Sequence, residues 1–264
     1  MADRLNKLNG KEWLQHSFSI WRDIQKNQEE RALKHPAMFP IMLAERIIEI
    51  FTNKPGMTIL DPFMGSGTTL IAAQKLGHNG IGFDISNDYV KMAKERLQVT
   101  YKELFNKNVD HKIYCDTAYK ISKYCEPDSV DLCITSPPYW DILNQKRTAD
   151  RKQIRKYSDL HVDFSNIENY ENFLNALKKS FTEVYKVLKI NKFCVVIVMD
   201  IRKKSHFYSF HFDLAQKIKE INFSLQDIII WDRQKEYNNM RPLGYPYSFI
   251  VNKVHEYIMI FKKI

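Results

Sequence analysis

Short apolar runs alternate with amphipathic stretches along most of this chain, and the alternation predicts an α/β fold. Short runs rich in apolar side chains predict buried strands, and these lie at 57–60, 80–85, 113–116, 130–134, 193–200, 225–231 and 254–261. Apolar residues spaced three and four apart predict helices, at 41–51, 70–76, 88–105, 170–188 and across 212–218. We therefore expect a mostly parallel, twisted sheet with helices on both faces.

The first 34 residues are polar and mixed in charge, and we expect a helical extension over 1–34. Trp13, Phe18 and Trp21 are spaced like the apolar face of a helix. This spacing favours packing on the core over contact with a partner.

Size and charge narrow the class of protein. The 264 residues suffice for one large α/β domain, so we expect 1–264 to be a single domain. The formal net charge of +9 favours an anionic partner, most simply nucleic acid or a membrane surface. No run approaches the roughly 18 apolar residues of a membrane helix, and the first residues lack the apolar centre of a signal peptide. A cytoplasmic protein without a membrane partner is the expectation.

The four cysteines indicate neither a metal site nor a redox pair. None of them has C-x-x-C spacing, so no metal is expected. Three of them lie in or beside apolar strand-like runs and are expected to be core thiols.

A glycine turn directly follows the first predicted strand. Residues 61–69 read Asp-Pro-Phe-Met-Gly-Ser-Gly-Thr-Thr and lead into the helix 70–76. Glycine lets the backbone approach a ligand closely, and the free N–H groups of a helix start favour an anion or carboxylate. The turn has neither the full G-x-G-x-x-G pattern nor a P-loop lysine. It therefore favours a small adenosine-containing cofactor over a phosphate cradle.

Two of the following strands end in an acid. Asp84 lies about 20 positions after the glycine turn, the spacing at which a carboxylate meets a ribose diol in doubly wound folds. Asp116 ends the strand 113–116. A lone acid at a strand end is commonly a helix cap, but two of them beside a glycine turn favour a cofactor site.

After the strand 130–134 the chain reads Thr-Ser-Pro-Pro-Tyr-Trp over 135–140. Proline has no N–H and a fixed φ, so the sheet ladder cannot continue, and the residue before each proline is held extended. Residues 136–139, here called the shelf, thus form a rigid segment at the carboxyl end of a strand, where open α/β sheets bind ligands. A hydroxyl, free carbonyls and an aromatic ring suit a planar group with an exposed amine.

Two long segments, 141–166 and 233–247, lack apolar periodicity and are expected to be functional loops. Basic residues gather in the first loop and in a patch at 202–204, which favours contacts with phosphates. The candidate phosphate-contacting residues are Lys146, Arg147, Arg151, Lys152, Arg155, Lys156, Arg202, Lys203 and Lys204.

Together, segment 61–69 and the shelf resemble the exocyclic-amine DNA methyltransferases, which use S-adenosylmethionine to methylate adenine N6 or cytosine N4. Segment 35–40 resembles the one that helps enclose the cofactor in that family, and 255–262 resembles its closing strand. The resemblance runs from about His35 to Lys263. It implies a Rossmann-like class I methyltransferase fold with an antiparallel C-terminal strand.

In this chain the cofactor segments precede the shelf, which resembles the gamma-like motif order of that permuted family. Little room remains after the catalytic half for a separate target-recognition region. Recognition would then rest on the loops 141–166 and 233–247, on the N-terminal helix, or on a partner chain.

The resemblance also implies roles for individual residues. The target amine would donate hydrogen bonds to Ser136 Oγ and the Pro137 carbonyl, and Tyr139 would stack on a base flipped out of the duplex. Asp84 would accept from the ribose hydroxyls, and Asp116 would lie near the adenine amine. The catalytic residues would be Ser136, Pro137, Pro138 and Tyr139. The cofactor residues would be His35, Pro36, Phe39, Asp61, Pro62, Phe63, Gly65, Ser66, Gly67, Thr68, Asp84 and Asp116.

Serine at the first position of the shelf favours cytosine N4 in that family, whereas aspartate or asparagine favours adenine N6. We therefore expect a site-specific cytosine-N4 methyltransferase of double-stranded DNA in a restriction–modification system, with a cognate endonuclease or a specificity partner. The alternatives are adenine N6, an RNA or protein-amide substrate, and a non-catalytic nucleic-acid-binding protein. For Asp61 the alternative is a purely structural bond to the glycine turn.

Overall fold

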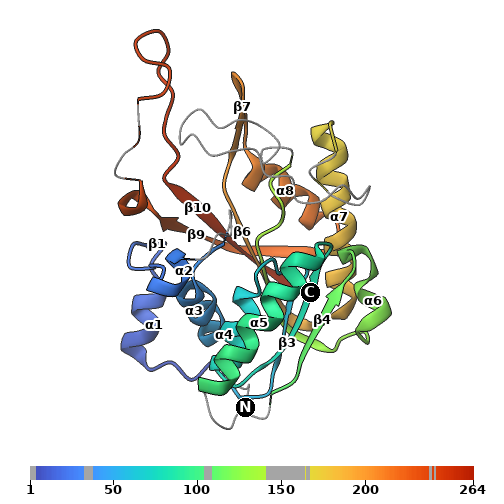
Figure 1. Ribbon diagram of the computed structural model, residues 1–264. Coiled ribbons are helices and arrows are strands. Elements are labelled where there is room, and N and C mark those ends of the chain that lie inside the picture. Colours follow the sequence, from blue (N-terminus) through green and yellow to red (C-terminus); the bar gives the residue numbers. More distant parts are fainter. Residues whose placement is uncertain are drawn as a thin grey trace.

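The computed structural model describes residues 4–32, 38–103, 109–140, 164, 167–237, 240 and 242–264, and within them eight strands form one sheet (Figure 1). In spatial order these are β1 (Ile20–Trp21), β9 (Phe223–Asp232), β10 (His255–Lys263), β6 (Leu188–Val198), β5 (Val130–Thr135), β2 (Thr58–Asp61), β3 (Asn79–Asp84) and β4 (His111–Cys115). Neighbouring strands are parallel except where β10 pairs with β6 and with β9. The expected mostly parallel sheet with an antiparallel C-terminal strand is confirmed.

Helices cover both faces of this sheet, as the alternating pattern predicts. One face carries α3 (Ile41–Phe51), α4 (Thr68–Lys75) and α5 (Asn87–Glu103). The other carries the short helices η1 (Ala118–Lys120) and α6 (Ile121–Tyr124) together with α7 (Tyr170–Val187) and α8 (Phe210–Lys219). Because successive strand residues point to opposite faces, β5 supplies Leu132 and Ile134 to one core and Cys133 to the other.

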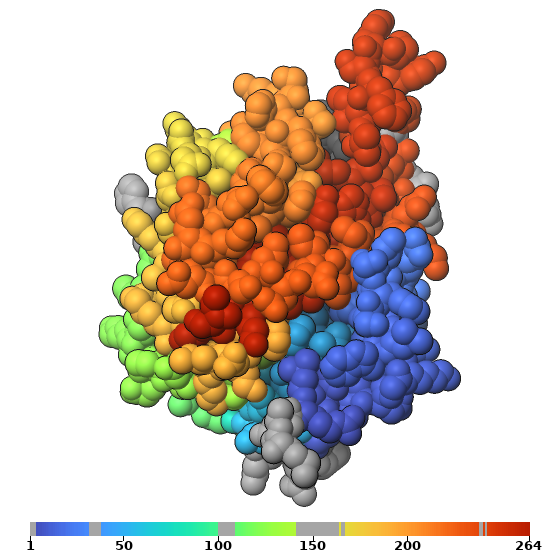
Figure 2. Space-filling model, turned by 180° about the vertical axis from the view of Figure 1, so that it is seen from behind, coloured from blue at the N-terminus to red at the C-terminus, as the bar shows by residue number. Residues whose placement is uncertain are grey.

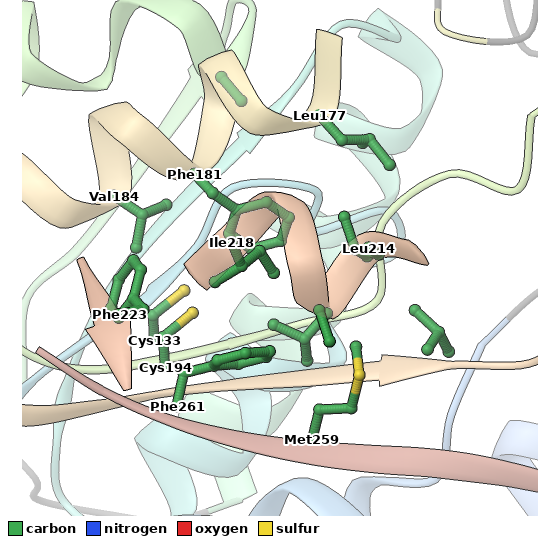
Figure 3. Close-up of a cluster of buried hydrophobic side chains, with 14 of the residues drawn as sticks. Cys133, Leu177, Phe181, Val184, Cys194, Leu214, Ile218, Phe223, Met259 and Phe261 are labelled. Carbon is green, nitrogen blue, oxygen red and sulfur yellow. The ribbon is translucent and has the colours of Figure 1, made fainter. Parts of the chain in front are cut away.

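The core beneath α7 and α8 contains two of the cysteines (Figure 3). Cys133 of β5 lies opposite Cys194 of β6 in the parallel ladder. The third buried thiol is Cys125, beyond the end of α6, whereas Cys115 is exposed although it belongs to the strand β4. An apolar strand-like run therefore does not by itself bury a thiol.

The N-terminal segment departs from one continuous apolar helix. The helix α1 (Gly10–His16) begins at an Asn9 cap and is followed by the strand β1 and the helix α2 (Gln28–Ala32). Trp13 and Phe18 are exposed, at 48% and 54%, whereas Trp21 is 2% exposed and lies in β1. Pairing of β1 along β9 ends the helical pattern, because Ser19 accepts a ladder hydrogen bond from a β9 amide there.

Two projections leave the carboxyl edge of the sheet (Figure 1). One is the hairpin of β7 (Ile201–Lys203) and β8 (His206–Tyr208), residues 201–208, here called the basic hairpin. The other, here called the aromatic arm, comprises residues 242–251 between β9 and β10, after the short helix η4 (Gln234–Glu236). No helix within the described part of the chain is both long and apolar enough to span a membrane.

Candidate active site

A pocket at the carboxyl ends of β2, β3, β4 and β5 joins the glycine turn to the shelf. The empty space within it, open mouth included, is about 840 Å³. The predicted residues that line it are Phe39, Pro62, Phe63, Gly65, Ser66, Thr68, Asp84, Asp116, Ser136, Pro137, Pro138 and Tyr139. Residues that line it without having been predicted are Met38, Met64, Ile85, Ala118 and Phe164.

The glycine turn is held between the ends of β2 and β3. The Gly65 amide, at φ 50°, donates to Asp84 Oδ2 over 3.0 Å. The Ser66 carbonyl accepts from Arg96 Nη1 of α5 over 2.6 Å, and Ser66 Oγ accepts from the same nitrogen over 3.0 Å. Arg96 was not predicted, because it lies on a helix about 30 residues downstream with no local motif. These bonds hold the middle of the turn from two sides, through Asp84 at the end of β3 and Arg96 of α5.

Asp61 is a buried brace beneath this turn and does not line the pocket. Its Oδ1 accepts from the Phe63 amide over 3.1 Å and from Thr135 Oγ1 over 2.7 Å, and its Oδ2 accepts from Thr69 Oγ1 over 2.6 Å. Burial raises the pKa of Asp61 to about 6, against the opposing effect of these hydrogen bonds. The residue ties the glycine turn to the last residue of β5, so its contacts match the structural alternative.

Gly67 also faces away from the pocket. It caps α4 with φ 82°, in the left-handed region that favours glycine. A Cβ at this position would lie 2.8 Å from the Cβ of Ala93 in α5. The absence of a side chain at Gly67 therefore lets the start of α4 pack closely against α5.

Asp84 and Asp116 bring carboxylates from neighbouring strand ends to the pocket. The second oxygen of Asp84, Oδ1, accepts from the Ser86 amide over 2.8 Å. Since each carboxylate oxygen has further acceptor capacity, Asp84 can still receive hydroxyl donors from a ligand.

Asp116 is held in an ionised state by its neighbours. Its Oδ1 accepts from Lys120 Nζ and from the Thr117 amide, both over 2.8 Å, and its Oδ2 accepts from the Tyr124 hydroxyl over 2.8 Å. Burial raises the pKa of Asp116, but the hydrogen bonds and the Lys120 charge outweigh it, so the pKa lies below its ordinary value. The pocket therefore contains a fixed negative charge at its β4 end.

The shelf begins directly after Thr135, the last residue of β5. The Tyr139 ring packs edge-on against Phe210, with ring centroids 6.0 Å apart, and its hydroxyl lies 3.5 Å from Glu256 Oε2. Burial, and then the Glu256 charge, raise the pKa of Tyr139 well above its ordinary value. Tyr139 is therefore a neutral phenol at any pH at which the protein would work.

Glu256 lies behind the shelf in β10 and pairs with Arg233. Burial raises the pKa of the Glu256 carboxyl, and the Arg233 charge opposes that rise. Arg233 also lies over the Trp231 ring, with its Cζ 4.7 Å from the ring centroid. This buried pair fixes the carboxylate toward which the Tyr139 hydroxyl points.

Trp140 connects the shelf to the basic hairpin. It is buried, has φ 32°, and donates from Nε1 to the Ile167 carbonyl over 2.6 Å. Lys203 Nζ lies 4.0 Å from the centroid of the Trp140 ring, a cation–π distance. Of the predicted phosphate contacts, Arg202, Lys203 and Lys204 thus lie on a hairpin that contacts the residue directly after the shelf.

The remaining predicted residues lie outside the described residues. They are His35, Pro36, Lys146, Arg147, Arg151, Lys152, Arg155 and Lys156. Within the described ranges, no group of three or more His, Cys, Asp or Glu side chains is arranged to hold a metal ion.

Three known proteins are similar to this chain in sequence or in fold. Type II methyltransferase M2.DpnII of Streptococcus pneumoniae is 45% identical over 80 residues, which are 30% of this chain and 30% of that protein. Type II methyltransferase M.BglI of Bacillus subtilis is 37% identical over 99 residues, 36% of this chain and 27% of that protein. The aligned part therefore spans about three tenths of the length of these curated relatives. TrmN from Thermus thermophilus shares the fold, with a TM-score of 0.55 and 14% identity over 87% of this chain and 50% of that chain.

The family model covers much more of the chain than the two curated methyltransferases do. The DNA methylase model for N6 and N4 methyltransferases matches residues 2–95 and 130–264. The matched parts include the glycine turn, the shelf and the closing strand β10. This chain therefore belongs to the N6/N4 DNA methylase family, whose members depend on S-adenosylmethionine.

Proposed function

We propose that this chain transfers a methyl group from S-adenosylmethionine to the exocyclic N4 amine of cytosine in double-stranded DNA. The observation that carries the proposal is that one pocket contains both the glycine turn and the shelf. A methyl donor at one end and an amine at the other would then meet inside a single cavity. The Type II methyltransferases among the relatives support a role in restriction–modification. A cognate endonuclease would be the partner that such a role implies.

The residues at the cofactor end fit S-adenosylmethionine by their chemistry. Asp84 can accept from two ribose hydroxyls, and the Asp116 carboxylate can accept from an adenine amine. Met38, Phe39 and Phe63 supply apolar walls for a purine ring. The backbone at Gly65 and Ser66 would receive the methionine part. When bound, S-adenosylmethionine supplies an electrophilic methyl group on its sulfonium.

The residues at the shelf would prepare the amine. The lone pair of an exocyclic amine is delocalised into the base, which makes the amine a poor nucleophile. Hydrogen bonds accepted by Ser136 Oγ and the Pro137 carbonyl from both N–H groups favour a tetrahedral nitrogen with a localised lone pair. Such a lone pair could accept the methyl group that bound S-adenosylmethionine would supply, and the electron pair of the broken C–S bond would remain on sulfur.

Neither side chain at the shelf is a strong base. Ser136 is a neutral hydroxyl, and Tyr139 is a neutral phenol because burial and Glu256 raise its pKa. The amine proton therefore leaves to solvent during or after methyl transfer. Most of the acceleration would come from positioning, which supplies roughly 7–11 kcal/mol in well-oriented reactions.

Duplex DNA hides the cytosine amine, so the base must leave the stack at a cost of a few kcal/mol. Tyr139 lines the pocket and offers a ring against which an extruded base can lie. Phosphate contacts from the basic hairpin would offset the unstacking.

The test is incubation of the chain with unmethylated duplex DNA and labelled S-adenosylmethionine, followed by digestion to nucleosides and mass spectrometry. We expect N4-methylcytosine from the wild type, at least a hundredfold less from Ser136→Ala, and wild-type amounts from Ser224→Ala, whose serine lies in β9 away from the pocket. Methylation of adenine N6 alone would refute the cytosine assignment. Label in RNA or protein, with none in DNA, would refute DNA as the substrate.

A further inference from the structure

The aromatic arm exposes three rings at its end. Tyr245, Tyr247 and Phe249 are 79%, 93% and 97% exposed, and the neighbouring Val251 is 64% exposed. The arm projects from the body of the protein in both overall views (Figures 1 and 2). Clustered exposed apolar side chains mark a surface that a partner covers.

The arm is a built turn. Leu243 and Ile250 form an antiparallel bridge across it, and the Gly244 carbonyl accepts from the Tyr247 and Ser248 amides over 2.8 and 2.7 Å. Gly244 has φ 76°, and a Cβ there would lie 2.2 Å from the Ser248 carbonyl oxygen. The fold therefore holds the rings away from the core by specific backbone bonds.

The surroundings of the arm are positively charged. Lys253 at its base and Arg202 of the basic hairpin both lie over the Phe207 ring, at 5.4 and 5.5 Å from its centroid. The segments 201–211 and 237–255 contain no Asp or Glu. This charge matches a polyanion. It opposes a symmetric contact with a second copy of the chain, because such a contact places like charges together.

The basic hairpin lies between the base of the arm and the end of the shelf. Its Phe207 ring contacts Lys253, two residues beyond the arm, and its Lys203 contacts the ring of Trp140, the residue directly after the shelf. The arm and the basic hairpin therefore project from the same carboxyl edge of the sheet as the shelf.

We propose that the aromatic arm inserts its rings between bases of the duplex DNA that the basic hairpin binds by its phosphates. The inference rests on DNA as the proposed substrate and adds a stacking contact to it. Rings at a base step stabilise an opened duplex, as apolar wedges do in proteins that unstack DNA. Stacking on aromatic rings tolerates any base, so this contact is separate from sequence readout.

The test uses the full chain and a fluorescent duplex of random sequence, with anisotropy measured over a series of salt concentrations. Tyr247→Ala and Phe249→Ala should each weaken binding roughly 5- to 150-fold, the range for loss of one stacked ring. The slope of log affinity against log salt should stay unchanged for these variants, because no phosphate contact is lost. Arg202→Ala and Lys204→Ala should instead make the slope shallower by about 1 for each contact.

Two controls separate stacking from loss of fold or of apolar surface. Tyr247→Phe keeps a ring and should bind as the wild type does. Trp13→Ala removes a ring that is 48% exposed on α1, away from the arm, and should leave binding unchanged. Permanganate oxidation of thymines gives a second measurement, since bound wild type should raise their reactivity and the two alanine variants should not.

The outcomes distinguish this proposal from the proposed function. Wild-type affinity and thymine reactivity in the Tyr247→Ala and Phe249→Ala variants would overturn the stacking role, even if the chain methylates DNA. The same result accompanied by a smaller oligomer would assign the arm to contacts between copies. Weakened binding with an unchanged salt slope supports the stacking role even if no methyl transfer to DNA is found.

Discussion

Replacing Asp61 by alanine removes the brace beneath the glycine turn. The side chain accepts from the Phe63 amide and from the hydroxyls of Thr69 and Thr135, both of which are fully buried. Each buried donor left without a partner costs about 1–3 kcal/mol. Allowing for partial relaxation, we expect Asp61→Ala to lower the free energy of unfolding by about 3–5 kcal/mol.

Asparagine keeps the shape of the brace and removes its charge. Its Oδ1 can retain the two bonds of the aspartate Oδ1, and its amide can donate to the Thr69 hydroxyl, since a hydroxyl also accepts. Because the buried carboxylate is disfavoured relative to its neutral form, Asp61→Asn should be at least as stable as the wild type at pH 7.5.

The charge of Asp61 also predicts a pH dependence. Burial places the folded-state pKa at about 6, above the ordinary value of 3.8, so the folded state binds more protons than the unfolded state between these two values. The stability that this group contributes is therefore complete below pH 3.8 and is lost as the pH rises through 6. A shift from 3.8 to 6 corresponds to about 3 kcal/mol.

Urea unfolding of the wild type and of Asp61→Asn between pH 4 and pH 7.5, roughly the window set by these pKa values, measures this contribution. The difference in unfolding free energy, wild type minus variant, should fall by about 2–3 kcal/mol across the window, because part of the contribution is already lost at pH 4. Because the two proteins share all other titrating groups, the contributions of those groups to the pH dependence cancel in the difference. A difference independent of pH would refute the raised pKa, and an Asp61→Ala variant as stable as the wild type would refute the brace.

Three further substitutions test neighbouring parts of the site. Asp84→Asn should weaken binding of S-adenosylmethionine at least about tenfold by calorimetry, and unchanged affinity would remove this carboxylate from the cofactor site. Gly67→Val combines a Cβ 2.8 Å from an α5 side chain with φ 82° and should destabilise the fold by about 2–4 kcal/mol in thermal unfolding. Arg233→Met leaves the Glu256 carboxylate buried and unpaired, which should cost about 3–5 kcal/mol. The double variant with Glu256→Leu should recover most of that loss, and a double variant as unstable as the single one would contradict the pairing.

The core elements could be predicted because apolar periodicity reports burial. The helix 41–51 was predicted with the bounds that α3 has, and the strand 130–134 is one residue shorter than β5. The pattern does not predict the start of β6, because this part of the strand contains the polar residues Lys189, Asn191 and Lys192 and lies outside the buried part of the sheet. No local sequence pattern predicts the strand β1 either. Its two residues form a strand only because they pair with β9, about 200 positions away.

The site was predicted where its chemistry follows a strand. The glycine turn, Asp84, Asp116 and the shelf all come directly after apolar runs, and the structure brings them to one pocket. A sequence does not report which way a side chain points in such a turn, so Asp61 and Gly67 were assigned to the cofactor although they contact the protein itself. Arg96 could not be found from a motif, because it reaches the turn from α5, 30 residues further along the chain.

The central claim is that the shelf transfers a methyl group from the cofactor bound at the glycine turn to DNA. Its most direct test pairs calorimetric binding of S-adenosylmethionine with single-turnover transfer of labelled methyl to duplex DNA, for the wild type and for Ser136→Ala. Ser136→Ala should bind the cofactor within about twofold of the wild type and transfer at least about a hundredfold more slowly, a loss of roughly 2.7 kcal/mol in transition-state stabilisation. Transfer at the wild-type rate by Ser136→Ala, or no transfer to DNA by the wild type while it binds the cofactor, would contradict the claim.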